Sequence, residues 1–331
     1  MSEILLTYIV PVYNTEGYVL KCLQSIVNQG LQSELYEVLV VDDGSTDGSR
    51  KVVMNFADDH PQVRLLKQAN AGVSAARNLA LDSARGRYVQ FIDSDDYLKP
   101  GMMATLVQRA IDEQLDVLQF NYSWMEPDGT ELPMEDDPSP VATGVDYLRG
   151  HILTPYVWRF LIRRDSLEQR ALRFDTSLIV CEDGAFISDF LLNAKRMAHD
   201  IVAPYCHVKR SDSAMHNAHP NYQLPRIISQ VNSAKVIDRV ARRYEDSAGE
   251  QVPPSILGLR NRYLYFSMTK ALSSGCVDAV VEHIKAVGMY PFPCMGSETG
   301  YYGLKWRVIH RLMMHPRLWH ALSKLYLMVK K

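Results

Sequence analysis

Three aspartates within four residues are the part of this sequence best suited to chemistry. Asp93, Asp95 and Asp96 directly follow the apolar run 88–92, which is typical of a buried strand. Carboxylates this close repel one another and do not all stay ionised unaided. A divalent cation would relieve the repulsion, because carboxylate oxygens suit Mg²⁺ and Mn²⁺. Asp93 and Asp95 could then face one ion and the phosphates that it carries. A solvated acidic turn is the alternative.

Two more polar turns follow strand-like runs. The segment 11–14 (PVYN) comes after the first run, and 42–47 (DDGSTD) comes after the second. Ligands of parallel sheets bind at the carboxyl ends of the strands, so we expect all three turns to meet along one edge. Taken alone, 42–47 could equally be an Asx-type turn that caps the following helix.

A segment of small residues, 70–78 (NAGVSAARN), lies between the second and third of these turns. Small residues allow the start of a helix to approach a sheet or a ligand closely. Arg77 sits one turn into that helix and can offer a planar guanidinium to a carboxylate or a phosphate. An ordinary surface arginine is the alternative.

The elements that must position these turns alternate in type. Apolar β-rich runs predict strands at 5–10, 37–41, 63–67, 88–92 and 117–122. Helical spacing predicts helices at 18–29, 47–60, 73–83, 102–114, 226–244 and 254–273. This alternation predicts an α/β fold with a mostly parallel sheet flanked by helices, followed by a helical C-terminal region. The acidic, Pro- and Gly-rich segment 126–140 predicts a surface loop.

Composition excludes several classes of protein. The chain has 331 residues, and 47% hydrophobic against 22% charged residues is too apolar for a disordered protein. No apolar run approaches the roughly 20 residues of a spanning helix, and the first residues lack the basic start of a signal peptide. Five scattered cysteines without CxxC spacing favour a reducing compartment over disulfides or structural zinc. We therefore expect a cytoplasmic protein.

The C-terminal tail differs in charge from the rest of the chain. No acidic residue follows Glu298, whereas seven of the 36 basic residues do, which leaves 29 basic against 38 acidic residues before them. From Trp306 the apolar residues have helical spacing, interrupted at Pro316. A basic amphipathic segment is typical of a helix on an anionic membrane, and a terminal helix packed on its own core is the alternative. The acidic body argues against nucleic acid as a partner.

Five ordered segments together resemble the family 2 glycosyltransferases of the GT-A fold, a Rossmann-like arrangement that binds nucleotide-sugars. They are YIVPVYN (8–14), VVDDGSTDGS (40–49), NAGVSAARNLAL (70–81), GRYVQFIDSDD (86–96) and CEDGAF (181–186). The resemblance implies a nucleotide-diphospho-sugar donor, with a UDP-sugar expected. It also implies three regions: a nucleotide-sugar-binding half at 1–122, an acceptor-binding half at 123–219, and a helical region at 220–331.

The resemblance assigns the donor site residue by residue. Pro11, Tyr13 and Asp43 would hold the nucleoside, with Asp43 accepting a hydrogen bond from a base N–H. Asn70 would line the same site. Arg77 would hold the diphosphate or position Asp93.

The DxD motif itself corresponds to Asp93 and Asp95. The resemblance implies that Asp95 ligates Mn²⁺ or Mg²⁺ directly and that Asp93 binds the ribose or the shell of the metal. Arg210 and Ser213 match an Arg-x-x-Ser loop that can reach the diphosphate. His207, His216 and His219 could complete the metal site, although lone histidines are more often structural.

The pair Glu182-Asp183 resembles the ED pair in which the aspartate commonly acts as catalytic base. One base and one displacement would invert the anomeric configuration, an outcome that the family implies. The alternative for the pair is an acidic helix N-terminus, which the helix dipole favours. Trp158 and Arg159 stand where the family often has Trp-x-Lys.

The implied activity is the transfer of one sugar per event to a glycan or lipid-linked acceptor in cell-surface polysaccharide biosynthesis, because the Q-x-x-R-W signature of processive synthases is missing. The enzyme would be cytoplasmic or peripheral on the inner face of the membrane. Two alternatives stay open: a nucleotidyltransferase, and a sugar-nucleotide-binding module without activity.

Overall fold

The computed structural model describes residues 3–210, 220–294, 296 and 303–329. These residues form two compact units. The first comprises Met1–Gly144, Tyr156–Thr176 and Asn193–Asp212, and the second comprises Val145–Pro155, Ser177–Leu192 and Ser213–Lys331. Each unit is therefore built from stretches that are distant in the sequence.

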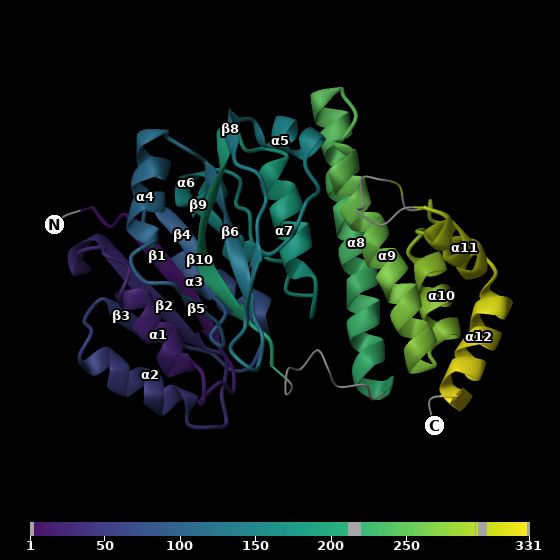
Figure 1. Cartoon of the computed structure of the whole chain (residues 1–331), viewed down its shortest axis with the longest axis horizontal. Helices are drawn as coiled ribbons and strands as arrows, with labels where there is room; N and C mark the ends of the chain where they lie inside the picture. Colours follow the sequence, from purple (N-terminus) through teal and green to yellow (C-terminus); the bar gives the residue numbers. More distant parts are fainter. Residues whose placement is uncertain (1–2, 211–219, 295, 297–302, 330–331) are drawn as a thin grey trace. The chain divides into compact units, whose positions relative to one another are not determined.

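The first unit contains one mixed sheet, in which the described residues form ten strands (Figure 1). The order is β3-β2-β1-β4-β9-β6-β10-β5, with β7 beside β6 and β8 beside β10. The strands β1 to β4 pair in parallel, as does β10 with β6. Their bounds are β1 Leu6–Val12, β2 Tyr36–Asp42, β3 Val63–Lys67, β4 Tyr88–Phe91, β5 Tyr97–Leu98, β6 Val117–Met125, β7 Glu131–Met134, β8 Ser139–Ala142, β9 Phe160–Arg163 and β10 Met197–Val208.

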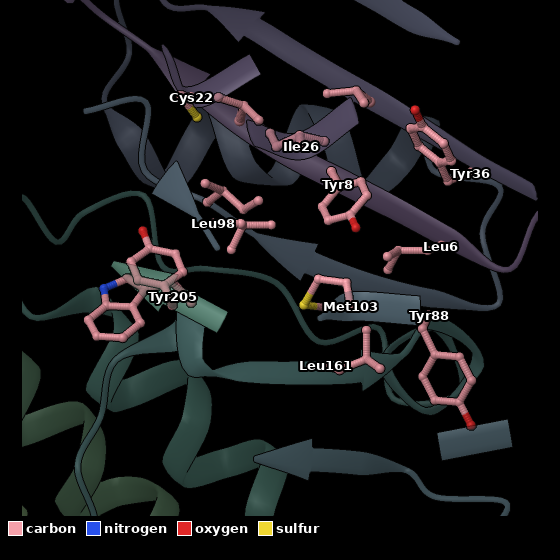
Figure 2. Packing of buried hydrophobic residues seen from close by; sticks show 14 of the residues in the cluster. Leu6, Tyr8, Cys22, Ile26, Tyr36, Tyr88, Leu98, Met103, Leu161 and Tyr205 are labelled. Carbon is pink, nitrogen blue, oxygen red and sulfur yellow. The ribbon is translucent and has the colours of Figure 1, made fainter. Parts of the chain in front are cut away.

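Helices cover this sheet, and the expected α/β fold is confirmed. They are α1 Val19–Val27, α2 Ser49–Asp58, α3 Val73–Ser83, α4 Met103–Asp112 and α6 Arg164–Glu168. Along β1, Leu6, Tyr8 and Val10 belong to a buried cluster that also contains Cys22 and Ile26 of α1 (Figure 2). Side chains of a strand alternate between faces, so the intervening residues face the opposite side of the sheet. Helix α3 contacts β1 and β2.

The segment 126–140 was expected to be a surface loop, and this expectation is wrong in part. It contains β7 and the first half of β8. Strand β7 continues the sheet because 126–130 turn back tightly, with Gly129 at φ 87° and its N–H donating to the Glu126 carbonyl. All four residues of β7 are exposed, which explains why the segment lacks the apolar pattern of a strand.

At the amino ends of the strands, one buried carboxylate joins three segments. Glu37 of β2 accepts hydrogen bonds from Thr7 Oγ1 at 2.9 Å, from Arg85 N at 2.7 Å and from Arg64 Nη1 at 3.1 Å. Burial alone would raise the pKa of Glu37, but the bonds from Arg85 and Thr7 outweigh it and hold the pKa below its ordinary value. Ionised Glu37 therefore stabilises the folded state.

This stabilisation should disappear in acid. A carboxyl whose pKa is lowered on folding contributes stability above its ordinary pKa of 4.5 and loses it as the pH falls through the lowered value. We expect Glu37→Gln to cost about 1.5–3 kcal/mol at neutral pH, near the low end because both arginines are partly exposed. Urea unfolding of both proteins from pH 7 downward measures the difference, which should shrink below pH 4.5. Exposed Glu3→Gln is the control, and a difference that is constant with pH would contradict the assignment.

The second unit is helical. Its elements are α5 Gly144–Gly150, whose first residue belongs to the first unit, α7 Glu182–Leu191, α8 Pro220–Ala248, α9 Pro254–Ser274, α10 Val277–Ala286, α11 Leu304–Met313 and α12 Pro316–Val329. Helices α8 and α9 pack side by side (Figure 1). Within the described part of the chain, none of the helices combines the length and the apolar character that crossing a bilayer requires.

Candidate active site

The three polar turns that follow β1, β2 and β4 meet in the first unit, as the sequence predicts. Thr15, which the sequence did not single out, joins the end of the first turn to the start of α2 and to the turn after β4. Its N–H donates to Ser49 Oγ at 2.8 Å and its hydroxyl donates to Ser94 Oγ at 3.1 Å. Asn14 Oδ1 accepts a hydrogen bond from Thr46 N at 2.8 Å. Hydrogen bonds therefore join the segments that follow these three strands at their carboxyl ends.

The two aspartates at the carboxyl end of β2 differ in role. Asp42 is buried and accepts hydrogen bonds from Ser45 N at 2.9 Å and Arg50 Nε at 2.5 Å. Burial alone would raise the pKa of Asp42, but these two bonds hold it below its ordinary value. Asp42 therefore closes the turn after β2, whereas the Asx-type contact at the start of α2 comes from Asp47, whose Oδ1 accepts from Ser49 N at 3.0 Å.

Asp43 instead holds the segment that precedes α3. Its Oδ1 accepts from Gln68 Nε2 at 2.7 Å and from Ala71 N at 2.8 Å, and its Oδ2 accepts from Gly72 N at 2.9 Å. Gly44 allows this approach, because a Cβ there would lie 2.8 Å from the backbone nitrogen of Asn70. The contact of Asp43 with a nucleobase stays a prediction.

The other residues expected to hold the nucleoside lie at or near the surface. Tyr13 is 48% exposed, Asn70 is exposed, and Pro11 is half-buried. An exposed tyrosine ring offers a face on which a flat base can stack. The binding roles of these three residues stay predictions.

The aspartates of the DxD motif each pair with one arginine. Arg77 Nη2 donates to Asp93 Oδ1 at 3.1 Å, and Arg210 Nη2 lies 2.7 Å from Asp95 Oδ2. Arg77 is buried, and its guanidinium lies 5.2 Å from the ring centroid of Phe174, so the surface-arginine alternative is wrong. Burial raises the pKa of Asp95 to about 6, with the neighbouring charges of Asp96 and Asp93 adding to the effect. The charges of Asp93 and Asp96 thus disfavour the ionised form of Asp95, although Asp93 and Asp95 each pair with an arginine.

Asp96 has a structural role that the sequence analysis missed. Its Oδ2 accepts from Tyr205 Oη at 2.7 Å and lies 2.9 Å from His207 Nδ1, and its Oδ1 accepts from Val208 N at 2.7 Å. Burial alone would lower the pKa of His207, but the bond to Asp96 raises it. The third aspartate thus attaches β10 to the turn after β4.

Three other residues predicted for the donor or metal site are not described by the structure. Ser213, His216 and His219 lie outside the described residues. Among the residues that the structure describes, no group of three or more His, Cys, Asp and Glu side chains is arranged to hold a metal ion. Among the described residues, Asp93 and Asp95 therefore supply only part of the coordination shell that a metal ion requires.

Trp158 and Arg159 lie within the first unit. Arg159 is buried, and its Nη2 donates to Asp136 Oδ2 at 2.8 Å. Trp158 stacks on Tyr205, with ring centroids 4.2 Å apart. Arg159 therefore has a carboxylate partner of its own, and Trp158 helps to pack the ring that contacts Asp96.

The pair Glu182-Asp183 begins α7 in the second unit. The preceding residue, Cys181, has a φ of 63°, so the chain turns sharply before the helix. Two serines of α8 hold this turn: Ser233 Oγ donates to the Cys181 carbonyl at 2.7 Å, and Ser229 Oγ accepts from Ile179 N at 2.8 Å. Both acids occupy the first turn of the helix, where the dipole favours them. The catalytic role of Asp183 stays a prediction.

Gly184 allows α9 to approach this helix start. A Cβ at this position would lie 2.3 Å from Tyr263 Oη, and Tyr263 is buried. We expect Gly184→Ala to destabilise the protein by about 1–3 kcal/mol through overpacking. Removing the hydroxyl with Tyr263→Phe in that background should restore part of the loss, measured by urea unfolding. Gly17→Ala, where nothing lies within 4 Å, is the control, and equal effects at both glycines would contradict the prediction.

The fold and the joined turns define a GT-A-type α/β protein, and comparisons with known proteins identify its family. The family model for glycosyl transferase family 2 matches residues 7–171. The uncharacterized glycosyltransferase YibD of Escherichia coli is 32% identical over 256 residues, 73% of this chain and 72% of YibD. EpsJ of Bacillus subtilis, also an uncharacterized glycosyltransferase, is 32% identical over 200 residues, 58% of each chain.

A solved structure has the same fold. The structure of S. aureus TarS in complex with UDP-GlcNAc superposes with a TM-score of 0.69 at 22% identity, covering 98% of this chain and 92% of that one. This chain therefore belongs to family 2 of the glycosyltransferases.

Proposed function

We propose that this protein transfers a single hexosyl group from a nucleotide-diphospho-sugar, a UDP-sugar in the first instance, to a glycan or lipid-linked acceptor with inversion. The observation that carries the proposal is the junction of the three turns, which presents Asp93 and Asp95 beside Arg77 and Arg210. The TarS structure with UDP-GlcNAc supports the donor class. Relatives with 27% and 29% identity, a poly(ribitol-phosphate) beta-glucosyltransferase and a minor teichoic acid biosynthesis protein, support a role in cell-surface polysaccharide biosynthesis.

In this proposal the donor binds mainly to residues 1–122, with Arg210 and Ser213 reaching its diphosphate. The half-exposed ring of Tyr13 stacks on the base beside Pro11 and Asn70, and Asp43 accepts a base N–H through its remaining lone pairs. Arg77 and Arg210 offer N–H donors to the diphosphate. Residues 123–219 hold the acceptor, and Ser213 would add a hydroxyl on the donor side.

The residues of the DxD turn fit Mn²⁺ or Mg²⁺. Their donor atoms are carboxylate oxygens, and burial together with the neighbouring charges of Asp96 and Asp93 raises the pKa of Asp95 to about 6. Mg²⁺ is typically held by one or two carboxylates together with substrate phosphates, a donor set that this turn can supply. Asp95 would be the direct ligand, and Asp93 would bind the ribose or the metal's water shell. A bound ion would neutralise charge on the departing diphosphate. A mannosyltransferase of the same fold was solved with GDP-Man and Mn²⁺.

Asp183 acts as the base in the proposed reaction. Its carboxylate accepts the proton of the acceptor hydroxyl while that oxygen forms a bond to the anomeric carbon. The bond from that carbon to the diphosphate oxygen breaks, and the nucleoside diphosphate leaves with the electron pair. A single displacement from the opposite face inverts the anomeric configuration. Glu182, which is buried, helps to fix the helix start.

Thermal-shift measurements with a panel of UDP-, GDP- and dTDP-sugars, each with and without Mn²⁺, test the proposal. We expect one nucleotide class to stabilise the protein, and only with the metal. Stabilisation by nucleoside triphosphates in place of nucleotide-sugars would favour a nucleotidyltransferase instead. Donor binding without donor hydrolysis or transfer would favour a binding module without activity.

The proposed place of the reaction is the cytoplasmic face of the membrane, where a lipid-linked acceptor would be accessible. The basic tail from Trp306 onward supports peripheral association with an anionic membrane.

A further inference from the structure

The two C-terminal helices each bury one face against their own unit. In α12, Trp319 is 5% exposed and its Nε1 donates to the Met268 carbonyl of α9 at 3.0 Å. Ser323 Oγ donates to the Leu272 carbonyl at 2.6 Å. In α11, Met313 is fully buried. The packed-helix interpretation of the tail is therefore correct for one face of each helix.

The opposite face of α12 is an exposed apolar stripe. Leu318, Leu325, Met328 and Val329 are 53%, 58%, 75% and 80% exposed. At 3.6 residues per turn these positions lie on one side of the helix, away from Trp319. Helix α11 repeats the arrangement with Leu304 and Val308, four residues apart and 78% and 49% exposed. Each helix thus has one face packed on the protein and one apolar face exposed to solvent.

Cations border both apolar faces, and no carboxylate interrupts them. The segment 303–329 contains no Asp or Glu, and its Lys and Arg side chains are all exposed: Lys305, Arg307, Arg311, Arg317 and Lys324. On α12, Arg317 and Lys324 lie along one border of the stripe. One acidic side chain reaches α12 from α10, where Asp278 lies 2.9 Å from His320 Nδ1. His320 is not part of the stripe.

We infer that the outward faces of α11 and α12 form a docking surface for an anionic lipid bilayer. Helices with an apolar face bordered by Lys and Arg lie in the plane of the interface, with the apolar side chains at the boundary of headgroups and acyl chains. The bordering cations then lie beside lipid phosphates. The inference commits to lipid for two reasons. A second copy of this chain would place identical sets of cations opposite each other. A nucleic acid would leave the apolar stripe without a partner.

Residues only a few positions apart on α12 therefore have different roles. Trp319 and Ser323 hold α12 on the protein, whereas Leu318, Leu325 and Met328 contact lipid. Deleting the tail cannot separate these roles, since it would also uncover α9. Point substitutions on the outward face avoid this problem, and Gln removes apolar character without changing the charge.

The test is cosedimentation of the full chain with phosphatidylcholine vesicles that do or do not contain phosphatidylglycerol. We expect binding to the anionic vesicles only, release by salt, and an affinity at least tenfold lower for the triple variant Leu318→Gln, Leu325→Gln, Met328→Gln. The matched control is Ile201→Gln, which changes a 62% exposed apolar residue of β10 in the first unit and should leave binding unchanged. Thermal unfolding checks that both variants fold.

Three outcomes would overturn the inference. The intact protein could fail to bind anionic vesicles, or the triple variant could bind them as well as the intact protein. The intact protein could also dimerise in sedimentation velocity, with dimerisation lost in the triple variant, which would make the face a contact between copies. The inference rests on the peripheral membrane association proposed above and names its surface. Because none of these measurements uses catalytic activity, their failure would leave the proposed transfer reaction standing.

Discussion

Replacing Asp183 by Asn should slow sugar transfer by roughly 10²–10⁴-fold, the range typical of losing a general base. The substitution keeps the shape of the side chain and removes its basic oxygen. The affinity for the donor and metal should stay unchanged, because the turns at Asp43 and Asp95 belong to the first unit and keep their contacts. Single-turnover rates beside UDP–Mn²⁺ affinity measure the two quantities separately.

Glu182→Gln is the matched control, because it makes the same chemical change one residue earlier in the same helix turn. Normal turnover of Asp183→Asn together with an inactive Glu182→Gln would move the base to Glu182. Normal turnover of both would leave the pair as a helix N-terminus only, and the base would lie elsewhere.

Removing the divalent cation should abolish transfer. A metal that neutralises the departing diphosphate contributes several kcal/mol, which corresponds to a rate loss of roughly 10²-fold or more. We expect activity to vanish in excess EDTA and to return with Mn²⁺ or Mg²⁺. Asp95→Asn should weaken metal-dependent donor binding itself, which distinguishes it from Asp183→Asn. Titration of UDP with and without Mn²⁺ measures this.

Asp96→Asn is the control variant for this experiment. Asp96 belongs to the same acidic turn, but its oxygens are engaged by Tyr205, His207 and Val208. Its substitution should lower stability while the metal requirement remains. Full activity in EDTA, or an Asp95→Asn variant with normal metal-dependent binding, would remove the metal from the mechanism.

The sequence predicts the first third of the fold well because the signal there is local. Buried parallel strands appear as short apolar runs, and each polar turn follows its strand directly. Pro61 and Gly30 mark helix ends within a few residues of the observed ones. The joining of the turns around Thr15 follows from the parallel topology, so their meeting was predictable even though Thr15 itself was not.

The remaining features depend on contacts between distant residues. The partners of Asp96 lie more than 100 residues later, on β10. The exposed strand β7 exists because β6 provides an edge for it, and no apolar pattern marks it. Both faces of α12 carry apolar side chains, and the contacts with α9 and α10 decide which face is buried.

The order of the strands has a consequence for how this protein folds during synthesis. Strand β6 does not touch β4; β9, about 35 residues further along the chain, lies between them, and β10 covers the other side of β6. The sheet therefore cannot close until residue 208 has left the ribosome, well after β1 to β4 are available to pair. Until β9 emerges, β4 and β6 present unpaired edges, and the other edge of β6 waits for β10; such edges are sites of misassociation. Chaperone demand should thus peak while the middle of the chain is being translated, and codon changes that slow translation just before β9 should increase aggregation more than those after β10.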